Sequence, residues 1–378
     1  MELKPFLLER YFAEYEFSTR YLLSSSDCDG WPQAKILAMA DGEARKLWRN
    51  LRLGYTESRG LPLLRREISL LYKGLNEDDV LVAAPEEAIF IAMNCLLRKG
   101  DRILCTYPGY QSLYEIARSL GCAVDLWKPE EGAQWTFNVG SLKKKISPKT
   151  KLIIVNFPHN PTGALPSGGD FHKILSLAQE RGIYVFSDEM YRFLEVDLRD
   201  RLPSACELYG KAISLFGMSK TFGMAGTRIG WLATRDRALL QRMAEFKDYT
   251  TICNSAPSEI LALIGLRAKD EIIQVHRRRI ERNLTLLDAF FKRNRAAMSW
   301  IRPKAGTIAF PKLLRAKNAD SFCEAVIKEA RVMLLPAAVY GIKGSHFRIG
   351  FGRENMPEAL ERLERFLARH SAGAGLIS

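Results

Sequence analysis

The sequence predicts an α/β protein with a three-layer αβα large domain, built on a mostly parallel sheet, and a smaller α+β domain. Between about residues 40 and 270, short apolar runs rich in β-branched residues alternate with longer helical patterns. This order is typical of a parallel sheet covered by helices. After Pro303 the pattern changes to strand-like pieces, GTIAFPKL and SHFRIGFG, with helices between them. A chain of 378 residues is also too long for one small core.

Two domains are therefore expected. The large domain is predicted over residues 40–275, and residues 1–39 together with residues 276–378 are predicted to form the small domain. No internal repeat is present, and only the last residues, SAGAGLIS, are expected to form a disordered tail. Two domains make a cleft between them the expected place for a ligand.

Seven strands are expected in the large domain. Each is a short apolar run bounded by turn residues, as is typical of strands buried in a parallel sheet. In chain order they are VLVAA (80–84), RILCTY (102–107), AVDLW (123–127), KLIIVNF (151–157), IYVFSDE (183–189), AISLFG (212–217) and IGWLAT (229–234).

Three of the helices between these strands are predicted to end at Gly100, Gly121 and Gly182. Glycine is the residue most often found just beyond the end of a helix, because it adopts the left-handed conformation without strain. A long basic helix is expected over residues 258–295.

The formal net charge of +13 is spread along the chain. The densest basic runs, Lys143 to Lys145 and Arg277 to Arg279, lie in segments with helical character, which is typical of solvated helix faces. No nucleic-acid partner is therefore expected. The positive field would instead favour small molecules that carry phosphate.

The seven cysteines are widely spaced and include no CxxC pair or Cys/His cluster. This spacing argues against a disulfide framework and against a metal site, and it favours a reducing compartment. The N-terminus lacks the continuous apolar stretch of a signal peptide or membrane anchor. We therefore expect a cytoplasmic protein without a membrane partner.

Polar residues end four of the predicted strands. KLIIVNF runs into PHNPTG, IYVFSDE into DEMY, AISLFG into GMSK, and RILCTY into TYPGY. Ligands of such sheets bind beyond the carboxyl ends of the strands. We therefore expect one edge of the sheet to carry an amide, an acid with a phenol, an amine and an aromatic ring.

This combination resembles the pyridoxal-phosphate (PLP) enzymes of the aspartate aminotransferase superfamily, which are the class I and II aminotransferases of fold type I. The resemblance implies that fold, with PLP bound to the large domain. Several short motifs in order are far more specific than any one alone. They are GYTESRGLPLLR (54–65), YPGY (107–110), HNPTG (159–163), SDEMY (187–191), SKTFGMAGTRIG (219–230) and FRIGFG (347–352).

The resemblance implies a catalytic role for Lys220, which would form a Schiff base with the cofactor aldehyde and move the Cα proton. Asp188 would keep the pyridine nitrogen protonated, while Tyr191 and Asn160 would hydrogen-bond the 3′-oxygen. From the residues alone, a helix cap is the alternative role for Asp188, and Asn160 is in any case a turn residue before a proline.

The same resemblance implies the other cofactor contacts. Tyr110 would stack on the ring, and Arg228 with Ser219 would hold the phosphate. Tyr55 would reach the phosphate of a neighbouring subunit, which implies a homodimer with shared active sites. Arg348 would grip the substrate carboxylate, with Asn160 close by.

Three stretches depart from the family pattern. At the phosphate site the usual Gly-Ala-x-Glu is replaced by a stretch in which Pro85 lacks an amide donor and Glu86 adds negative charge. Gly217 stands where a serine is common. In the segment LLSSSDCDGWP (22–32), Asp27 and Cys28 are candidates to face the substrate, with a capped turn as the alternative.

The resemblance implies a transfer of an amino group between an L-amino acid and a 2-oxo acid. A PLP-dependent lyase, decarboxylase or cyclising synthase is the alternative, because the outcome depends on which Cα bond stands perpendicular to the ring. A more remote alternative is an aminotransferase-like regulatory or binding protein. That alternative needs a separate DNA-reading module, and no such module precedes the first motif.

Overall fold

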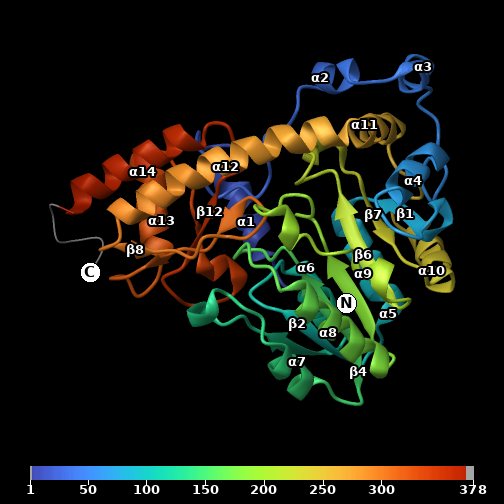
Figure 1. Cartoon of the computed structure of the whole chain (residues 1–378), viewed down its shortest axis with the longest axis horizontal. Helices are drawn as coiled ribbons and strands as arrows, with labels where there is room; N and C mark the ends of the chain where they lie inside the picture. Colours follow the sequence, from blue (N-terminus) through green and yellow to red (C-terminus); the bar gives the residue numbers. More distant parts are fainter. Residues whose placement is uncertain (1, 372–378) are drawn as a thin grey trace.

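The computed structural model describes residues 2–371. Its centre is a seven-stranded sheet in the order β1-β7-β6-β5-β4-β2-β3 (Figure 1). Strand β7 runs antiparallel to both of its neighbours, whereas β2 to β6 run parallel, which confirms the predicted mostly parallel sheet. The strands are Val80–Ala83 (β1), Arg102–Thr106 (β2), Ala123–Trp127 (β3), Thr150–Asn156 (β4), Tyr184–Asp188 (β5), Ala212–Gly217 (β6) and Gly230–Ala233 (β7).

Helices cover both faces of this sheet, so the three-layer prediction is also confirmed. Side chains alternate between the faces along each strand. On β4, Ile154 lies in the apolar cluster beneath α5, whereas its neighbours Ile153 and Val155 lie in the cluster beneath α8. The helices of this region are Pro62–Ser69 (α4), Pro85–Leu96 (α5), Ser112–Ser119 (α6), Val139–Lys145 (α7), Gly168–Glu180 (α8), Ala205–Leu208 (α9), Arg237–Lys247 (α10) and Ala256–Arg267 (α11).

Two of the three predicted helix ends are confirmed. Gly121 and Gly182 follow α6 and α8 with φ of 81° and 65°, as expected beyond a helix end. The prediction at Gly100 was wrong, because Leu97 is already extended and α5 ends at Leu96. Gly100 has a positive φ in the following turn instead.

The prediction of a single basic helix over residues 258–295 was also wrong. The segment contains two helices, α11 and α12 (Lys269–Arg293), which meet at Ala268. Ala268 leaves the helical region with a ψ of 14°, so the axis changes direction there. In Figure 1, α12 runs from α11 across the molecule to the C-terminal elements.

The C-terminal part has the predicted α+β composition. It contains a two-stranded and a three-stranded sheet with two further helices. Its elements are Met298–Ser299 (β8), Ile308–Ala309 (β9), Lys312–Leu313 (β10), Asp320–Ala330 (α13), Leu335–Pro336 (β11), Phe347–Gly350 (β12) and Met356–Ser371 (α14).

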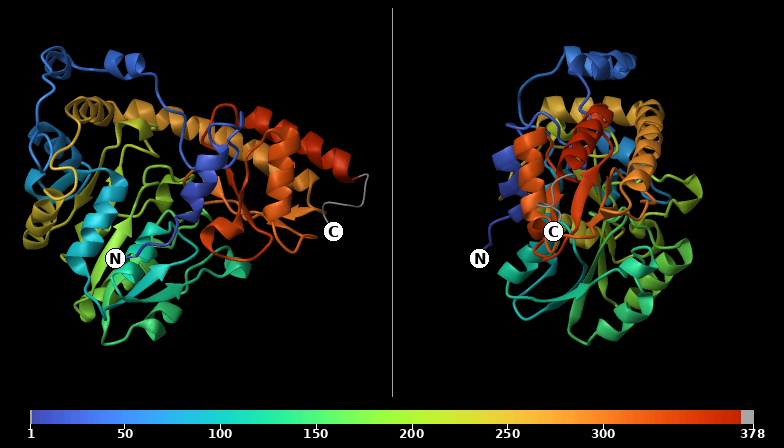
Figure 2. Two further views of the ribbon diagram at one scale, coloured as in Figure 1. Left: turned by 180° about the vertical axis from the view of Figure 1, so that it is seen from behind. Right: turned by 90° about the vertical axis from the view of Figure 1, so that its left-hand side faces the viewer.

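The N-terminal helix α1 (Leu7–Tyr15) lies against this C-terminal part, as both views of Figure 2 show. The Tyr11 hydroxyl donates to the Leu334 carbonyl, and the Met333 amide donates to the Tyr21 carbonyl at 2.8 Å. These contacts support the predicted joining of the N-terminal segment to the small domain.

The next two helices, α2 (Gln33–Ala38) and α3 (Gly42–Arg49), pack on α11 instead. Ile36 of α2 is buried in the same apolar cluster as Trp231 of β7. The domain boundaries at residues 39/40 and 275/276 stay predictions, and this packing argues for a first boundary before α2.

The tail predicted at SAGAGLIS lies outside the described residues, except that Ser371 ends α14. Within residues 2–371, no helix combines the length and the apolar composition that crossing a membrane requires.

Candidate active site

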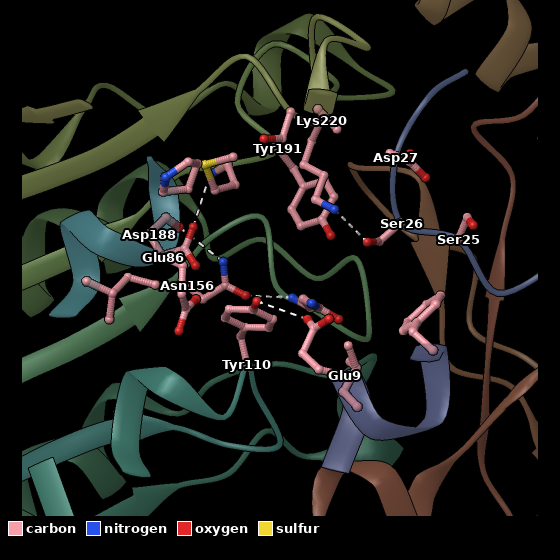
Figure 3. Close-up of a pocket in the computed structure, with 18 of the residues that line it drawn as sticks. Glu9, Ser25, Ser26, Asp27, Glu86, Tyr110, Asn156, Asp188, Tyr191 and Lys220 are labelled. Atoms are coloured by element: carbon pink, nitrogen blue, oxygen red, sulfur yellow. Dashed lines mark hydrogen bonds between the residues drawn. The ribbon is translucent and has the colours of Figure 1, made fainter. Parts of the chain in front are cut away.

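A cavity of about 390 Å³ opens at the carboxyl ends of β4, β5 and β6 (Figure 3). Its walls come from the ends of these strands, the start of α5, the helix α1, the segment 25–27 and strand β12. The cavity therefore lies between the central sheet and the C-terminal part. The predicted site residues that line it are Asp27, Pro85, Glu86, Tyr110, Asn160, Asp188, Tyr191, Ser219, Lys220, Arg228 and Arg348.

Lys220 lies in the loop that follows β6. Its Nζ donates to the Ser26 Oγ at 2.9 Å, a contact drawn in Figure 3. Burial lowers the pKa of the Lys220 ammonium, although Asp27 acts in the opposite direction. A lowered pKa increases the share of neutral amine, which is the form that reacts with an aldehyde and accepts a proton.

Asp188 ends β5 and is only 5% exposed. The Met190 amide donates to its Oδ1 at 3.1 Å, yet burial raises the pKa of this carboxyl to about 7. A carboxylate in such a place is stabilised by a cation beside it. A protonated pyridine nitrogen would supply that cation, so Asp188 fits the role that the resemblance implies.

Tyr191 and Asn160 project from the loops after β5 and β4. The Tyr191 hydroxyl is buried and makes no hydrogen bond of ordinary geometry within residues 2–371. Buried polar groups are normally paired, so this hydroxyl is available to a bound oxygen atom. Asn160 is held by Asn156, whose Oδ1 accepts the Asn160 amide at 2.8 Å.

Arg348 lies on β12 and is 1% exposed. Its Nε donates to the Ser24 carbonyl and its Nη1 donates to the Tyr340 hydroxyl, both at 2.9 Å. Its Nη2 is buried and has no partner within the described part of the chain. The guanidinium is thus fixed in position with a donor left open, which fits a carboxylate bound in the cavity.

The predicted phosphate site contains fewer donors than is usual in the family. Arg228 and Ser219 line the cavity near the N-terminus of α5. Pro85, the first residue of α5, has no amide hydrogen, and the Glu86 carboxylate accepts a hydrogen bond from Ser112 at 3.2 Å. Burial raises the pKa of Glu86, which reduces the repulsion that a carboxylate here would exert on a phosphate. The cation and the remaining donors fit a phosphate group.

Gly217 is required by the packing of two strands. A Cβ added to it would lie 2.9 Å from the Gly230 Cα and 3.1 Å from the Ile229 carbonyl oxygen. The ring of Pro85 packs against the same two glycines. The serine that is common here in the family would therefore not fit between β6 and β7.

The remaining predicted residues differ in their placement. Tyr110 lines the cavity, and its hydroxyl donates to the Glu9 Oε1 at 3.2 Å. Asp27 lines the cavity but pairs with Arg353 at 3.2 Å. Cys28 is 1% exposed, packs in the main apolar cluster and does not line the cavity. Tyr55 is 89% exposed and lies outside the cavity of its own chain.

The cavity wall formed by α1 was not predicted from the sequence. Leu8, Glu9, Phe12 and Glu16 line the cavity, and their spacing places them on one helix face. That periodicity was the available signal. Ser26, which lies next to the candidate Asp27, was not predicted either.

Comparisons with known proteins agree with this geometry. Aromatic-amino-acid aminotransferase 2 of Thermococcus litoralis is 28% identical over 331 residues, which cover 83% of this chain and 84% of the relative. A PLP-dependent aminotransferase from Streptococcus suis has a TM-score of 0.91 and 30% identity, over 98% of this chain and 99% of that chain. The PLP-dependent cyclase OrfR has a TM-score of 0.89 and 26% identity, over 98% of each chain.

The family described as aminotransferase class I and II matches residues 21–363 of the sequence. This match includes the strands of the central sheet, the loop of Lys220 and the strand of Arg348. The chain belongs to the class I and II aminotransferase family.

Proposed function

We propose that the protein is an aminotransferase that moves an amino group between an L-amino acid and a 2-oxo acid. The observation that carries this proposal is one cavity with an amine, a buried carboxyl and a fixed guanidinium, namely Lys220, Asp188 and Arg348. The cofactor is pyridoxal 5′-phosphate. When bound, it supplies an aldehyde that captures the amino group and a ring that withdraws electrons from Cα.

The residues of the chain would bind the substrate, transfer the proton and stabilise the charge on the ring. Arg348 would bind the α-carboxylate through its open Nη2 and so orient the amino acid. Lys220 Nζ would remove the proton from Cα, which its lowered pKa favours because more of the amine is neutral. Asp188 would hold a positive charge at the ring nitrogen.

Tyr191 and Asn160 would fix the opposite edge of the ring. The Tyr191 hydroxyl, which makes no hydrogen bond of ordinary geometry within residues 2–371, would donate to the 3′-oxygen. The Asn160 amide group would share that contact, and its Oδ1 already accepts hydrogen bonds from Tyr340 and Arg348. One residue thus connects the cofactor site with the carboxylate site.

Borohydride reduction of the PLP-loaded protein tests this assignment. It should fix the cofactor covalently on Lys220, as measured by peptide mass spectrometry. Lys247 is the internal control, because it is also buried with a lowered pKa but donates to the Ser58 carbonyl and does not line the cavity. A loaded sample with an unmodified Lys220 would contradict the proposal.

A cyclising or eliminating enzyme is the second candidate. It is favoured by the likeness to the cyclase OrfR and by the unusual wall of Ser25, Ser26 and Asp27. Incubation with amino acids in the absence of a 2-oxo acid separates the two. A transaminase should release one equivalent of 2-oxo acid per site and stop, whereas the alternative enzyme should release product continuously.

A homodimer and a cytoplasmic location are also proposed. The exposed Tyr55 supports the dimer, because the tyrosine of this motif would be useful only in the site of a neighbouring subunit. The cytoplasm is supported by the wide spacing of the seven cysteines.

A further inference from the structure

The cavity wall formed by α1 has no role in the chemistry described above. Glu9 and Phe12 lie on α1, and Glu16 follows its last residue with helical backbone angles, so the intervals of three and four residues place the three side chains on one face. This face lines the cavity. Figure 3 shows Glu9 pointing from α1 toward Tyr110.

The two glutamates bring negative charge to the cavity without an ion pair of their own. Glu9 accepts a hydrogen bond from the Tyr110 hydroxyl, and neither Glu9 nor Glu16 forms an ion pair within residues 2–371. Burial and the Asp27 carboxylate raise the pKa of Glu16, whereas the charges of Arg353 and Lys220 act in the opposite direction. Asp27 differs from these two, because it is paired with Arg353.

The cations of the cavity already have other partners in the proposed function. Lys220 would be joined to the cofactor, Arg228 would face its phosphate, and Arg348 would face the substrate carboxylate. Glu86 lies at the phosphate end, where Ser112 donates to it. Away from the phosphate end, Glu9 and Glu16 are therefore the cavity-lining carboxylates of residues 2–371 that have neither an ion pair nor a cofactor cation beside them.

The carboxylate site lies directly beside the α1 face. The guanidinium carbon of Arg348 is 5.8 Å from the centre of the Phe12 ring, and Phe12 stands between the two glutamates along the helix. The open and buried Nη2 of Arg348 independently indicates an anionic group in this cavity. An amino acid held there by its carboxylate has its side chain within reach of α1.

We propose that the enzyme selects amino acids whose side chain carries a positive charge, an amine or a guanidinium, and that Glu9 and Glu16 hold this charge. The inference rests on the proposed function, because it assumes that Arg348 binds the α-carboxylate. A partly buried carboxylate pair discriminates strongly between a cation and a neutral group of the same shape, because the wrong substrate leaves the carboxylates unpaired.

Matched pairs of substrates test the proposal on the PLP-loaded enzyme. L-arginine is compared with L-citrulline, which has nearly the same shape but no charge, and L-lysine is compared with L-norleucine. The measured quantity is the ratio of kcat/KM, or of single-turnover rates, within each pair. We expect at least one cationic member to be favoured by about tenfold or more.

Substitutions assign the preference to α1. The double variant Glu9→Gln, Glu16→Gln keeps the shape of both side chains and should reduce the ratio by about fivefold or more, because a charge-assisted contact becomes a neutral one. Glu14→Gln is the matched control, since Glu14 is an exposed residue of the same helix and does not line the cavity. Its ratio should equal that of the wild type.

The possible outcomes separate this inference from the function on which it rests. If neutral amino acids react as well as cationic ones, the inference is overturned while the proposed function stands. The same holds if a preference exists but the double variant retains it. If no amino acid reacts, both proposals fail together.

Discussion

Burial decides the charge of the Asp188 side chain. Its pKa is raised from 3.8 to about 7, mainly because water is excluded from the end of β5. Since the folded pKa lies above the unfolded one, the folded chain binds more protons than the unfolded chain between these two values. The cofactor-free protein should therefore lose stability as the pH rises through this window.

Asp188→Asn should remove this loss, because asparagine has no proton to release. The contribution of Asp188 changes by up to about 1.4 kcal/mol per pH unit inside the window. Urea unfolding of the cofactor-free wild type and variant, at about pH 5 and about pH 8, measures the difference. Between these two pH values, the free energy of unfolding should fall by about 2–3 kcal/mol more for the wild type than for the variant. Equal losses would show that the carboxyl is not held protonated.

Arg348→Ala should affect substrates according to whether they carry a carboxylate. Removal of one partner from a buried charge pair costs about 2–5 kcal/mol, so kcat/KM for amino acids should fall by about 30-fold or more. An amine with the same side chain but no carboxylate should lose far less. If both kinds of substrate lose equally, Arg348 acts only through the packing around Tyr340.

The chemistry-bearing residues could be predicted where a motif coincides with a strand end. Lys220 and Asp188 are of this kind, since their positions follow from the strand pattern itself. Tyr340, which lies 180 positions from Asn160 and donates to it, could not be found in this way. Cys28 stays an untested substrate contact, although its side chain is buried in the apolar cluster whereas those of Ser26 and Asp27 line the cavity.

At the scale of elements, the contact between β6 and β7 depends on two glycines that face each other. Gly217 is in register with Gly230, and Pro85 covers both. The missing hydroxyl at position 217 and the proline at the start of α5 are therefore two parts of one packing arrangement. A change at either residue has to be accommodated by the other.

Gly217→Ser should accordingly destabilise the protein instead of improving the phosphate site. Overpacking a tight contact costs about 1–3 kcal/mol, which thermal or urea unfolding detects. Gly210→Ser is the control, because a Cβ at Gly210 meets no atom within 4 Å and the residue has no positive φ. A stable Gly217→Ser variant that binds PLP more tightly would contradict this account.

Elements were predictable where the apolar pattern alone decides them. Each of the seven predicted strands is present. Six of them are apolar runs whose residues are almost all buried, whereas the edge strand β3 is buried only at Trp127. The early end of α5 and the division between α11 and α12 were not visible, since Leu97 and Ala268 are ordinary helix residues whose conformation follows from tertiary packing.

For the whole molecule, the proposed homodimer gives the exposed Tyr55 a function. Tyr55→Ala should weaken PLP binding by about tenfold or more, the effect of losing one hydrogen bond to a charged group. When the Tyr55→Ala variant is mixed with the inactive Lys220→Ala variant, heterodimers should form. In each heterodimer, one of the two sites contains both an intact Lys220 and an intact Tyr55. An equal mixture would then restore up to about a quarter of the wild-type sites.

Subunit exchange followed by an activity assay at limiting PLP measures this restoration. A mass in solution of twice the chain mass is the accompanying check. Mixtures no more active than the sum of their two components, in a protein shown to be dimeric, would mean that Tyr55 serves no neighbouring site.

Helix α12 connects the two ends of the site. His276, in the first half of α12, donates from Nδ1 to the Thr221 carbonyl at 2.9 Å, one residue after Lys220. Asn283 donates to the Phe351 and Arg353 carbonyls, just beyond Arg348. The rigid helix α12 thus couples the two contacts. A movement of the C-terminal part that brings Arg348 closer to a substrate would also move the loop that carries Lys220.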